Sequence, residues 1–483
     1  MTVDAPLDKE LNRLPALGKG SVIHLLGVGG VGMASLAGLL AGEGYRVTGA
    51  DENLYPPMSD LVRDLGIPVT GGYGPESLDP RPDAVVVGNV VTARFPVVSA
   101  LREKRIPYVS FPRCLSELFL RDAKNLVVAG THGKTTITNL CARLFDSGGF
   151  APGFLVGGLS LDFPFPFRKA GGDRFVIEGD EYDSAFFDKV PKFVHYRPET
   201  VILTSSDFDH ADIYEDLDAV VRAFESLVRL IPEGGLLIAN GSDPTVRKIS
   251  ASARSRVLYY GEDPDCDWRL GDFVPEGRGS SFEVGGPGDF TLRLSWGKIG
   301  KHNALGAVAA VAAFAEAGGD PGFLPEAFRE LGGVRRRQEL VRESGDGTLL
   351  FDDFAHHPRA VSVTLNAFRE AFPDRRILAL FEPRSNTTRR AVFQDDYARA
   401  FARADRVFLS RVDRPEKAPE GDRLDLEKLR KDIGKARISE SPREMVEAVM
   451  GELKPGDVLV SMSNGNFGGL VAMLDAALKA KGL

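Results

Sequence analysis

Residues 127–140, VVAGTHGKTTITNL, carry the strongest chemical signal in this 483-residue chain. An apolar strand leads into a glycine-flanked turn, and Lys-Thr-Thr then opens a helix. Backbone N–H groups of such a turn, together with the helix N-terminus, bind phosphate. Lys134 is expected to reach the β and γ phosphates of a nucleoside triphosphate, and the Thr135 hydroxyl to hold Mg²⁺. Val128 occupies the first glycine position of the strict P-loop pattern.

Two acidic or histidine-bearing segments follow apolar runs in the same part of the chain. In FVIEGDEYDSAFFD (175–188), Glu178 lies at the end of the apolar run and is the predicted magnesium ligand, because hard oxygen atoms suit that ion. Asp180, Glu181 and Asp183 form either part of this site or a solvated acidic loop. In VILTSSDFDHADIY (201–214), His210 is predicted to bind a second metal ion or to orient the reacting phosphate.

A second glycine-rich loop lies near the N-terminus, in IHLLGVGGVGMASLAGLL (23–40). Gly27, Gly29 and Gly32 fit G-x-G-x-x-G, and Asp51 follows at about the spacing of the acidic residue in a dinucleotide site. An NAD-dependent oxidoreductase would explain this loop but leave residues 130–136 unused. A nucleotide-binding switch would need neither the acidic segment nor His210. Two phosphate loops favour an enzyme that joins molecules at the expense of a nucleoside triphosphate.

The elements that position these residues fall into three sections, each with strands that alternate with helices, which is typical of α/β domains with parallel sheets. We expect domains at residues 1–122, 123–333 and 334–483. Residues 257–296 are richer in glycine, proline and polar side chains and are expected to add antiparallel strands.

Composition limits the function classes further. A net charge of −8 argues against a general nucleic-acid or membrane-surface binder. The three cysteines have no metal-binding spacing, which fits a reducing compartment. With no signal peptide or membrane span expected, we predict a cytoplasmic protein of unknown oligomeric state.

Seven motifs together resemble the Mur ligase family of ATP-dependent amide ligases in peptidoglycan synthesis. They span nearly the whole chain, in the family's order: GVGGVGM (27–33), GTHGKTT (130–136), EGDEYD (178–183), DFDHADIY (207–214), GKHN (300–303), RRQE (336–339) and DDFAHHP (352–358). The resemblance implies a Rossmann-like N-terminal domain, a central P-loop ATPase-like domain and a Rossmann-like C-terminal domain.

The resemblance also implies the reaction. The lactyl carboxylate of UDP-N-acetylmuramate would be converted by ATP and Mg²⁺ to an acyl phosphate, which an amine then attacks. FEPRSNT (381–387) and MSNGNFGG (462–469) resemble the branch that adds the tripeptide L-Ala-γ-D-Glu-meso-diaminopimelate in peptidoglycan recycling. The branch that adds L-alanine in new synthesis is the alternative.

The resemblance assigns the roles of the family's site residues to the matching positions of this chain. The implied ATP-binding residues are Gly130, Thr131, His132, Gly133, Lys134, Thr135, Thr136, His302, Asn303, Arg337 and Asp353. The implied metal-binding residues are Thr135, Glu178 and His210. The implied UDP-sugar contacts are Gly27, Gly29, Gly30, Gly32, Asp51 and Asn89, and the implied amine-substrate residues are His356, Arg384 and Asn386. The implied catalytic residues are Lys134, His210, His356 and Arg337; His210 or His356 would take the proton of the amine.

Two departures from the family's pattern stand out. Gly306 replaces the second asparagine of an HNxxN motif, which puts one adenine contact in doubt, and Gln338 stands where many members have phenylalanine. The family's carbamylated lysine is expected to be absent, because no lysine lies between Lys192 and Lys248.

Overall fold

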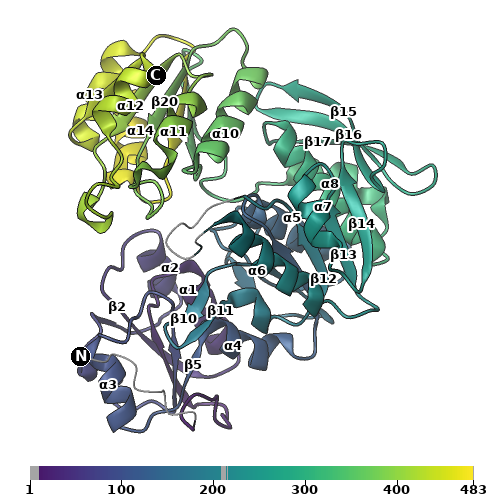
Figure 1. Ribbon diagram of the computed structural model, residues 1–483, viewed down its shortest axis with the longest axis vertical. Helices are drawn as coiled ribbons and strands as arrows, with labels where there is room; N and C mark the ends of the chain where they lie inside the picture. Colours follow the sequence, from purple (N-terminus) through teal and green to yellow (C-terminus); the bar gives the residue numbers. More distant parts are fainter. Residues whose placement is uncertain (1–9, 208–213, 215, 482–483) are drawn as a thin grey trace. The chain divides into compact units, whose positions relative to one another are not determined.

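The computed structural model describes residues 10–207, 214 and 216–481 of the chain (Figure 1). The chain divides into two compact units, which are described separately. Unit 1 comprises residues 1–206, 220–260 and 309–321, and unit 2 comprises residues 207–219, 261–308 and 322–483. Among the helices described, none is both long and apolar enough to cross a membrane.

The first sheet of unit 1 is parallel and has the strand order β3-β2-β1-β4-β5. Its strands are β1 (Val22–Leu26), β2 (Arg46–Asp51), β3 (Val69–Gly71), β4 (Ala84–Val87) and β5 (Tyr108–Ser110). Its helices are α1 (Val31–Gly42), α2 (Met58–Asp64), α3 (Pro96–Glu103) and α4 (Phe111–Leu115). The strand order changes direction between β1 and β4, and ligands of open α/β sheets bind at such a point. The glycine loop follows β1 there.

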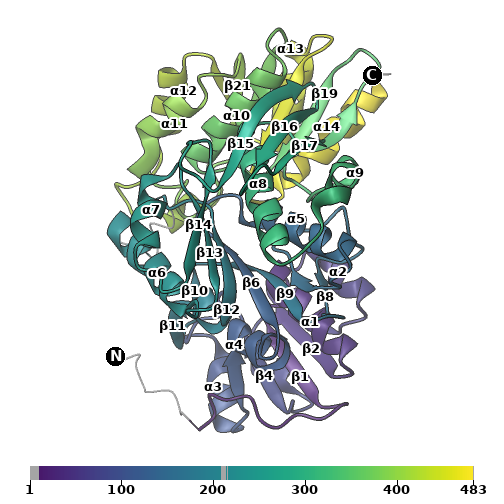
Figure 2. The same ribbon diagram turned by 90° about the vertical axis from the view of Figure 1, so that its right-hand side faces the viewer.

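The second sheet of unit 1 has the strand order β14-β13-β12-β6-β9-β7-β8, with the phosphate loop directly after β6 (Figure 2). The strands are β6 (Lys124–Ala129), β7 (Gly153–Leu155), β8 (Phe167–Arg168), β9 (Arg174–Gly179), β12 (Pro198–Leu203), β13 (Leu236–Asn240) and β14 (Arg256–Gly261). Its helices are α5 (Lys134–Ser147), α6 (Leu217–Leu230), α7 (Pro244–Ser250) and the C-terminal half of α8 (Lys301–Glu316). β6 lies between β12 and β9 and is parallel to both, so its carboxyl end is held from two sides.

A hairpin of β10 (Asp183–Ala185) and β11 (Asp188–Pro191) helps to join the two sheets of unit 1. Asp188 accepts a hydrogen bond from Ser110 at the end of β5 (2.6 Å) and pairs with His195 (2.9 Å). Burial acts to raise the pKa of Asp188, but these two partners outweigh it and hold the pKa below its usual value. Through Asp188 the hairpin therefore links β5 of the first sheet to the segment that precedes β12 of the second sheet.

Unit 2 contains an antiparallel meander and a mostly parallel sheet. The meander, as expected for this region, is β15 (Trp268–Glu276), β16 (Gly279–Gly285) and β17 (Thr291–Trp296), accompanied by α9 (Leu324–Glu330). The sheet has the order β18-β19-β23-β20-β21-β22, with only β18 antiparallel. Its strands are β18 (Glu339–Glu343), β19 (Leu349–Asp353), β20 (Ile377–Phe381), β21 (Arg406–Ser410), β22 (Ala436–Ser439) and β23 (Val458–Met462). Its helices are α10 (Pro358–Ala371), α11 (Gln394–Ala400), α12 (Leu426–Ile433), α13 (Pro442–Glu452) and α14 (Leu470–Ala480).

Two glycines of α1 give a test of how the sheets of unit 1 are joined. A Cβ atom on Gly38 would lie 2.0 Å from the Phe167 ring of β8, whereas one on Gly42 would meet nothing within 4 Å. We expect Gly38→Ala to lower the free energy of unfolding by about 1–3 kcal/mol, because it overpacks this contact. Gly42→Ala should instead raise it by about 0.5–1 kcal/mol through helix propensity. Equal effects in urea unfolding would contradict the close approach.

Candidate active site

The phosphate loop is shaped by two glycines and anchored by residues that follow β12. Gly130 has a φ of +123°, and a Cβ atom there would lie 2.2 Å from the Thr204 hydroxyl oxygen. That hydroxyl donates to the His132 carbonyl oxygen at 2.6 Å, and the Thr131 N–H donates to the Ser205 carbonyl oxygen at 3.1 Å. The loop therefore wraps tightly onto its neighbour, and the first N–H groups of α5, including that of Thr136, have no partner within the helix.

Lys134 begins α5 and is held by a buried ion pair. Its ammonium group donates to Glu181 at 2.9 Å and to the Gly130 carbonyl oxygen at 2.7 Å, and Glu181 is 2% exposed. Burial acts to lower the pKa of Lys134, but Glu181, Asp180 and Glu178 outweigh it and raise the pKa. The lysine therefore stays charged. For Glu181 the solvated-loop alternative is wrong, since its carboxylate is the counter-ion of the loop lysine.

Thr135 and Glu178 lie side by side next to this lysine. The Thr135 hydroxyl donates to Glu178 Oε2 at 3.1 Å, and the Gly157 N–H donates to Glu178 Oε1 at 2.5 Å. A hydroxyl oxygen and a carboxylate oxygen thus converge beside a phosphate loop, which is the donor set that Mg²⁺ accepts when phosphate oxygens complete its shell. His210, the other predicted metal ligand, lies outside the described residues.

The N-terminal glycine loop is fastened by Asp51 at the end of β2. Asp51 accepts the Gly29 N–H (2.8 Å) on one carboxylate oxygen and the Asn53 N–H (2.9 Å) on the other. Gly27 has a φ of +89°, and a Cβ atom on Gly32 would lie 3.3 Å from the Phe111 ring. Asp51 and Gly32 therefore shape and pack the loop, and their expected contacts with a UDP-sugar stay predictions.

Two other residues predicted for the UDP-sugar sit beside this loop. Gly30 directly precedes α1 as its N-cap, and Asn89 is exposed just after β4. Both lie near the strand-order change between β1 and β4, so their positions fit the predicted role.

In unit 2, Asp353 ends β19 and is buried. It accepts the N–H groups of Gln338 and Ala355, each at 2.8 Å. Burial raises the pKa of Asp353. The Arg337 guanidinium lies over the Phe354 ring, 4.4 Å from its centre. Arg337 and Asp353, two residues with implied ATP-binding roles, thus lie together at the DDFAHHP turn.

Gln338 is a residue whose role the sequence did not reveal. Its amide oxygen accepts from the Asn303 side chain (3.0 Å) and from the Ile299 N–H (3.1 Å). Asn303 also donates to the Ile299 carbonyl oxygen at 2.8 Å, and the exposed His302 ring lies 3.5 Å from the Gln338 amide nitrogen. Gln338 therefore positions His302 and Asn303, the two residues with implied adenine contacts. The sequence signal for this role was that Gln338 stands where many family members have phenylalanine.

The predicted amine-substrate residues also lie in unit 2. The His356 Nδ1 atom is 3.0 Å from the Phe354 carbonyl oxygen. Arg389 is 5% exposed and pairs with Asp413 (3.1 Å) and Asn386 (3.1 Å). Arg389 is therefore buried and held by residues of the chain itself.

Arg384 is more exposed than Arg389 and sits against a glycine turn. Its guanidinium lies 3.9 Å from Asp413, and a Cβ atom on Gly465 would lie 2.2 Å from Arg384 Nη1. The lack of a side chain at Gly465 thus leaves room for the Arg384 guanidinium. This explains one of the glycines in the SNGNFGG turn after β23.

Comparisons with known proteins match nearly the whole chain. Three family models match in order: "Mur ligase family, catalytic domain" (residues 22–122), "Mur ligase middle domain" (128–314) and "Mur ligase, glutamate ligase domain" (336–465). A UDP-N-acetylmuramate–L-alanyl-gamma-D-glutamyl-meso-2,6-diaminoheptandioate ligase of Escherichia coli is 39% identical and covers 93% of this chain and 96% of its own length.

Two further matches represent two kinds of ligase within the family. A UDP-N-acetylmuramate–L-alanine ligase of Halorhodospira halophila is 34% identical over 95% of this chain and 94% of its own. The crystal structure of a murein peptide ligase from Psychrobacter arcticus is 34% identical, with a TM-score of 0.74, and covers 95% of this chain and 99% of its own.

Asp352, next to Asp353, gives a pH test of unit 2. Its burial raises its pKa from 3.8 to about 6, although Arg336 at 3.3 Å opposes the rise. The stability that a neutral Asp352 contributes is complete below pH 3.8 and is lost as the pH rises through about 6. Relative to wild type, the unfolding free energy of Asp352→Asn should therefore increase by about 2 kcal/mol between pH 4 and pH 7.5. A difference in unfolding free energy that does not change with pH would contradict this.

Proposed function

The chain belongs to the Mur ligase family, and on that premise we propose that it is an ATP-dependent ligase that joins UDP-N-acetylmuramate to L-Ala-γ-D-Glu-meso-diaminopimelate. The observation that carries the choice of acceptor is the 39% identity, over 93% of the chain, to a ligase named for that tripeptide. The identity to an L-alanine ligase is lower, at 34%. L-Alanine is therefore the second candidate acceptor.

The first step places ATP on the phosphate loop of unit 1. Lys134 exchanges part of its contact with Glu181 for the β and γ phosphates, and the N–H groups at the start of α5 donate to phosphate oxygens. Thr135 and Glu178 would hold Mg²⁺, which when bound offsets the charge of the phosphates. These groups let the lactyl carboxylate attack the γ-phosphorus in line, and ADP leaves.

The second step forms the amide bond. The amine nitrogen attacks the carbonyl carbon of the acyl phosphate, and the tetrahedral intermediate expels phosphate and loses a proton. Holding both substrates in one site could lower the barrier by about 7–11 kcal/mol. The products are the amide, ADP and phosphate.

His356 and His210 are the two candidates for the proton acceptor. His356 is supported by its geometry: its Nδ1 atom lies 3.0 Å from the Phe354 carbonyl oxygen, a contact that favours the tautomer with a proton on Nδ1, in which Nε2 is the basic nitrogen. His210 lies outside the described residues.

The remaining roles follow from the same premise. Arg337, Asp353, His302 and Asn303 would bind the nucleotide, and the glycine loop with Asn89 would bind the UDP-sugar. Domains with boundaries near residues 122 and 333 would carry these substrates. The cytoplasm is the proposed compartment, because ATP and UDP-linked precursors are available there.

Phosphate release tests the acceptor directly. With ATP, Mg²⁺ and UDP-N-acetylmuramate, the tripeptide should support turnover at a kcat/KM at least 100-fold above that for L-alanine. Mass spectrometry should find the UDP-linked tripeptide. Lys134→Ala should abolish release with either acceptor. A higher kcat/KM for L-alanine would assign the protein to the other branch.

Arg384 tests how the acceptor is held. Arginine binds carboxylates with two parallel hydrogen bonds, and the tripeptide carries several carboxylates. Arg384→Ala should raise the KM for the tripeptide at least tenfold and leave the KM for ATP within twofold. Arg443→Ala removes an exposed arginine of α13 and serves as the matched control. Equal rises in both KM values for Arg384→Ala would refute the assignment.

A further inference from the structure

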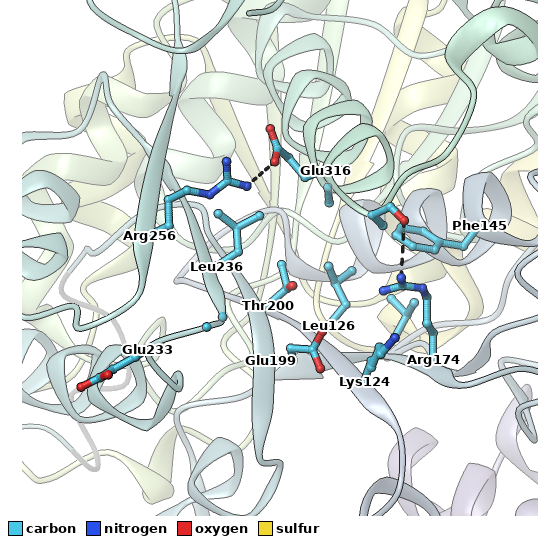
Figure 3. Close-up of a pocket in the computed structure, with 15 residues that line it drawn as sticks. Lys124, Leu126, Phe145, Arg174, Glu199, Thr200, Glu233, Leu236, Arg256 and Glu316 are labelled. Atoms are coloured by element: carbon cyan, nitrogen blue, oxygen red, sulfur yellow. Dashed lines mark hydrogen bonds and ion pairs between the residues drawn. The ribbon is translucent and has the colours of Figure 1, made fainter.

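We infer that unit 1 contains a second ligand site, for a small zwitterion of the amino-acid or short-peptide class, at the N-terminal edge of its second sheet. The site is a cavity of about 370 Å³, which lies within the range of small-molecule pockets (Figure 3). Lys124, at the start of β6, lines it, whereas the phosphate loop follows the other end of that strand. The two sites are separated by the length of a six-residue strand, which is about 20 Å.

The cavity exists because one row of paired residues across the sheet faces small side chains on the opposite wall. Val176, Leu126, Thr200 and Leu236 are in register on neighbouring strands, and all four line the cavity. The opposite wall includes Phe145 of α5 together with Ala313 and Ala317 at the end of α8. The lining also includes the exposed residues Glu233 and Gly234, so the cavity opens to solvent and a small ligand can enter it.

Arg174 presents a cation with unused hydrogen-bonding capacity to this space. Its guanidinium lies over the rings of Phe145 (5.7 Å) and Phe150 (5.1 Å), and it donates to the Ala317 carbonyl oxygen at the long distance of 3.5 Å. That long bond is the one hydrogen bond of the Arg174 side chain within the described part of the chain. The nearest carboxylate, Asp173, is 3.8 Å away and is already paired with Lys124 at 2.8 Å. A carboxylate ligand would complete this group.

Glu199 presents the opposite charge. It lies on β12 and lines the cavity, and its side chain has neither an ion pair nor a hydrogen bond within the described part of the chain. Arg256 and Glu316, on another side, pair with each other and need no ligand. An ammonium group is therefore the complement of Glu199.

The weakly bonded Arg174 and the unpaired Glu199 together define the ligand class; Glu233, the other carboxylate of the lining without a partner in the described residues, is exposed to water. A simple anion would leave Glu199 without a partner, and a simple cation would leave Arg174 incomplete. A zwitterion satisfies both, and the row of Leu126, Val176 and Leu236 accepts an apolar side chain. This inference rests on unit 1 alone and stands or falls separately from the proposed function.

Thermal-shift and calorimetric titrations of the full chain test it. The probes are the twenty standard amino acids and L-alanyl-L-alanine. At least one should raise the Tm in a saturable way, whereas its matched carboxylate-only and amine-only analogues should bind at least tenfold more weakly. Arg174→Gln and Glu199→Gln should each weaken binding at least tenfold. No saturable binding by any probe would overturn the inference.

Three variants identify where the probe binds. Ala317→Leu, directly after α8, fills the cavity and should abolish binding. Ala315→Leu makes the same change two residues earlier, in α8, at a residue that does not line the cavity, and should leave binding unchanged. Arg384→Ala, which alters the proposed acceptor site of unit 2, should also leave binding unchanged. Binding that survives Ala317→Leu but is lost in Arg384→Ala would place the probe at the acceptor site and refute the second site. Circular dichroism and urea unfolding would establish that each cavity variant is folded.

Discussion

The charge on Lys134 is the constraint around which the phosphate site is organised. A buried ammonium group is costly unless a counter-charge of good geometry accompanies it. Glu181 supplies that charge from 47 residues further along the chain, at 2.9 Å. The arrangement requires that β6 and β9 be neighbours, because the loop follows one strand and the acidic segment follows the other. The charge on Lys134 therefore depends on the strand order of the central sheet.

The same topology explains how other groups come to the loop. Thr204 and Ser205 follow β12, the strand on the other side of β6, and they hold the loop by its backbone. Glu178 ends β9 and meets Thr135 in the first turn of α5. The three strands thus end at one edge, where a nucleotide needs a cation, oxygen ligands and free N–H groups together. The β10–β11 hairpin then fixes the first sheet, with its own glycine loop, to this one.

Much of this could be predicted from local patterns. The apolar runs before both glycine loops form β1 and β6, and Glu178 lies where a strand followed by a carboxylate places it. Three-domain α/β architecture followed from strands that alternate with helices, and motif order identified the family. The features that local patterns did not predict depend on contacts between residues that are distant in the sequence. The burial of Glu181 and of Arg389, and the link from Gln338 to Asn303, cannot be read from spacing. Both carboxylate oxygens of Asp51 accept backbone N–H groups, a role that spacing did not indicate, and its contact with a UDP-sugar stays a prediction.

The central claim is that ATP activates the carboxylate of UDP-N-acetylmuramate before the tripeptide attacks it. The most direct measurement uses UDP-N-acetylmuramate labelled with ¹⁸O in its lactyl carboxylate, together with ATP and the tripeptide. The account predicts that each phosphate released carries one ¹⁸O atom from the carboxylate, detected as an isotope shift in ³¹P NMR, and that Lys134→Ala releases none. Phosphate that contains no ¹⁸O from the carboxylate would mean that ATP is hydrolysed by water, and would contradict the mechanism.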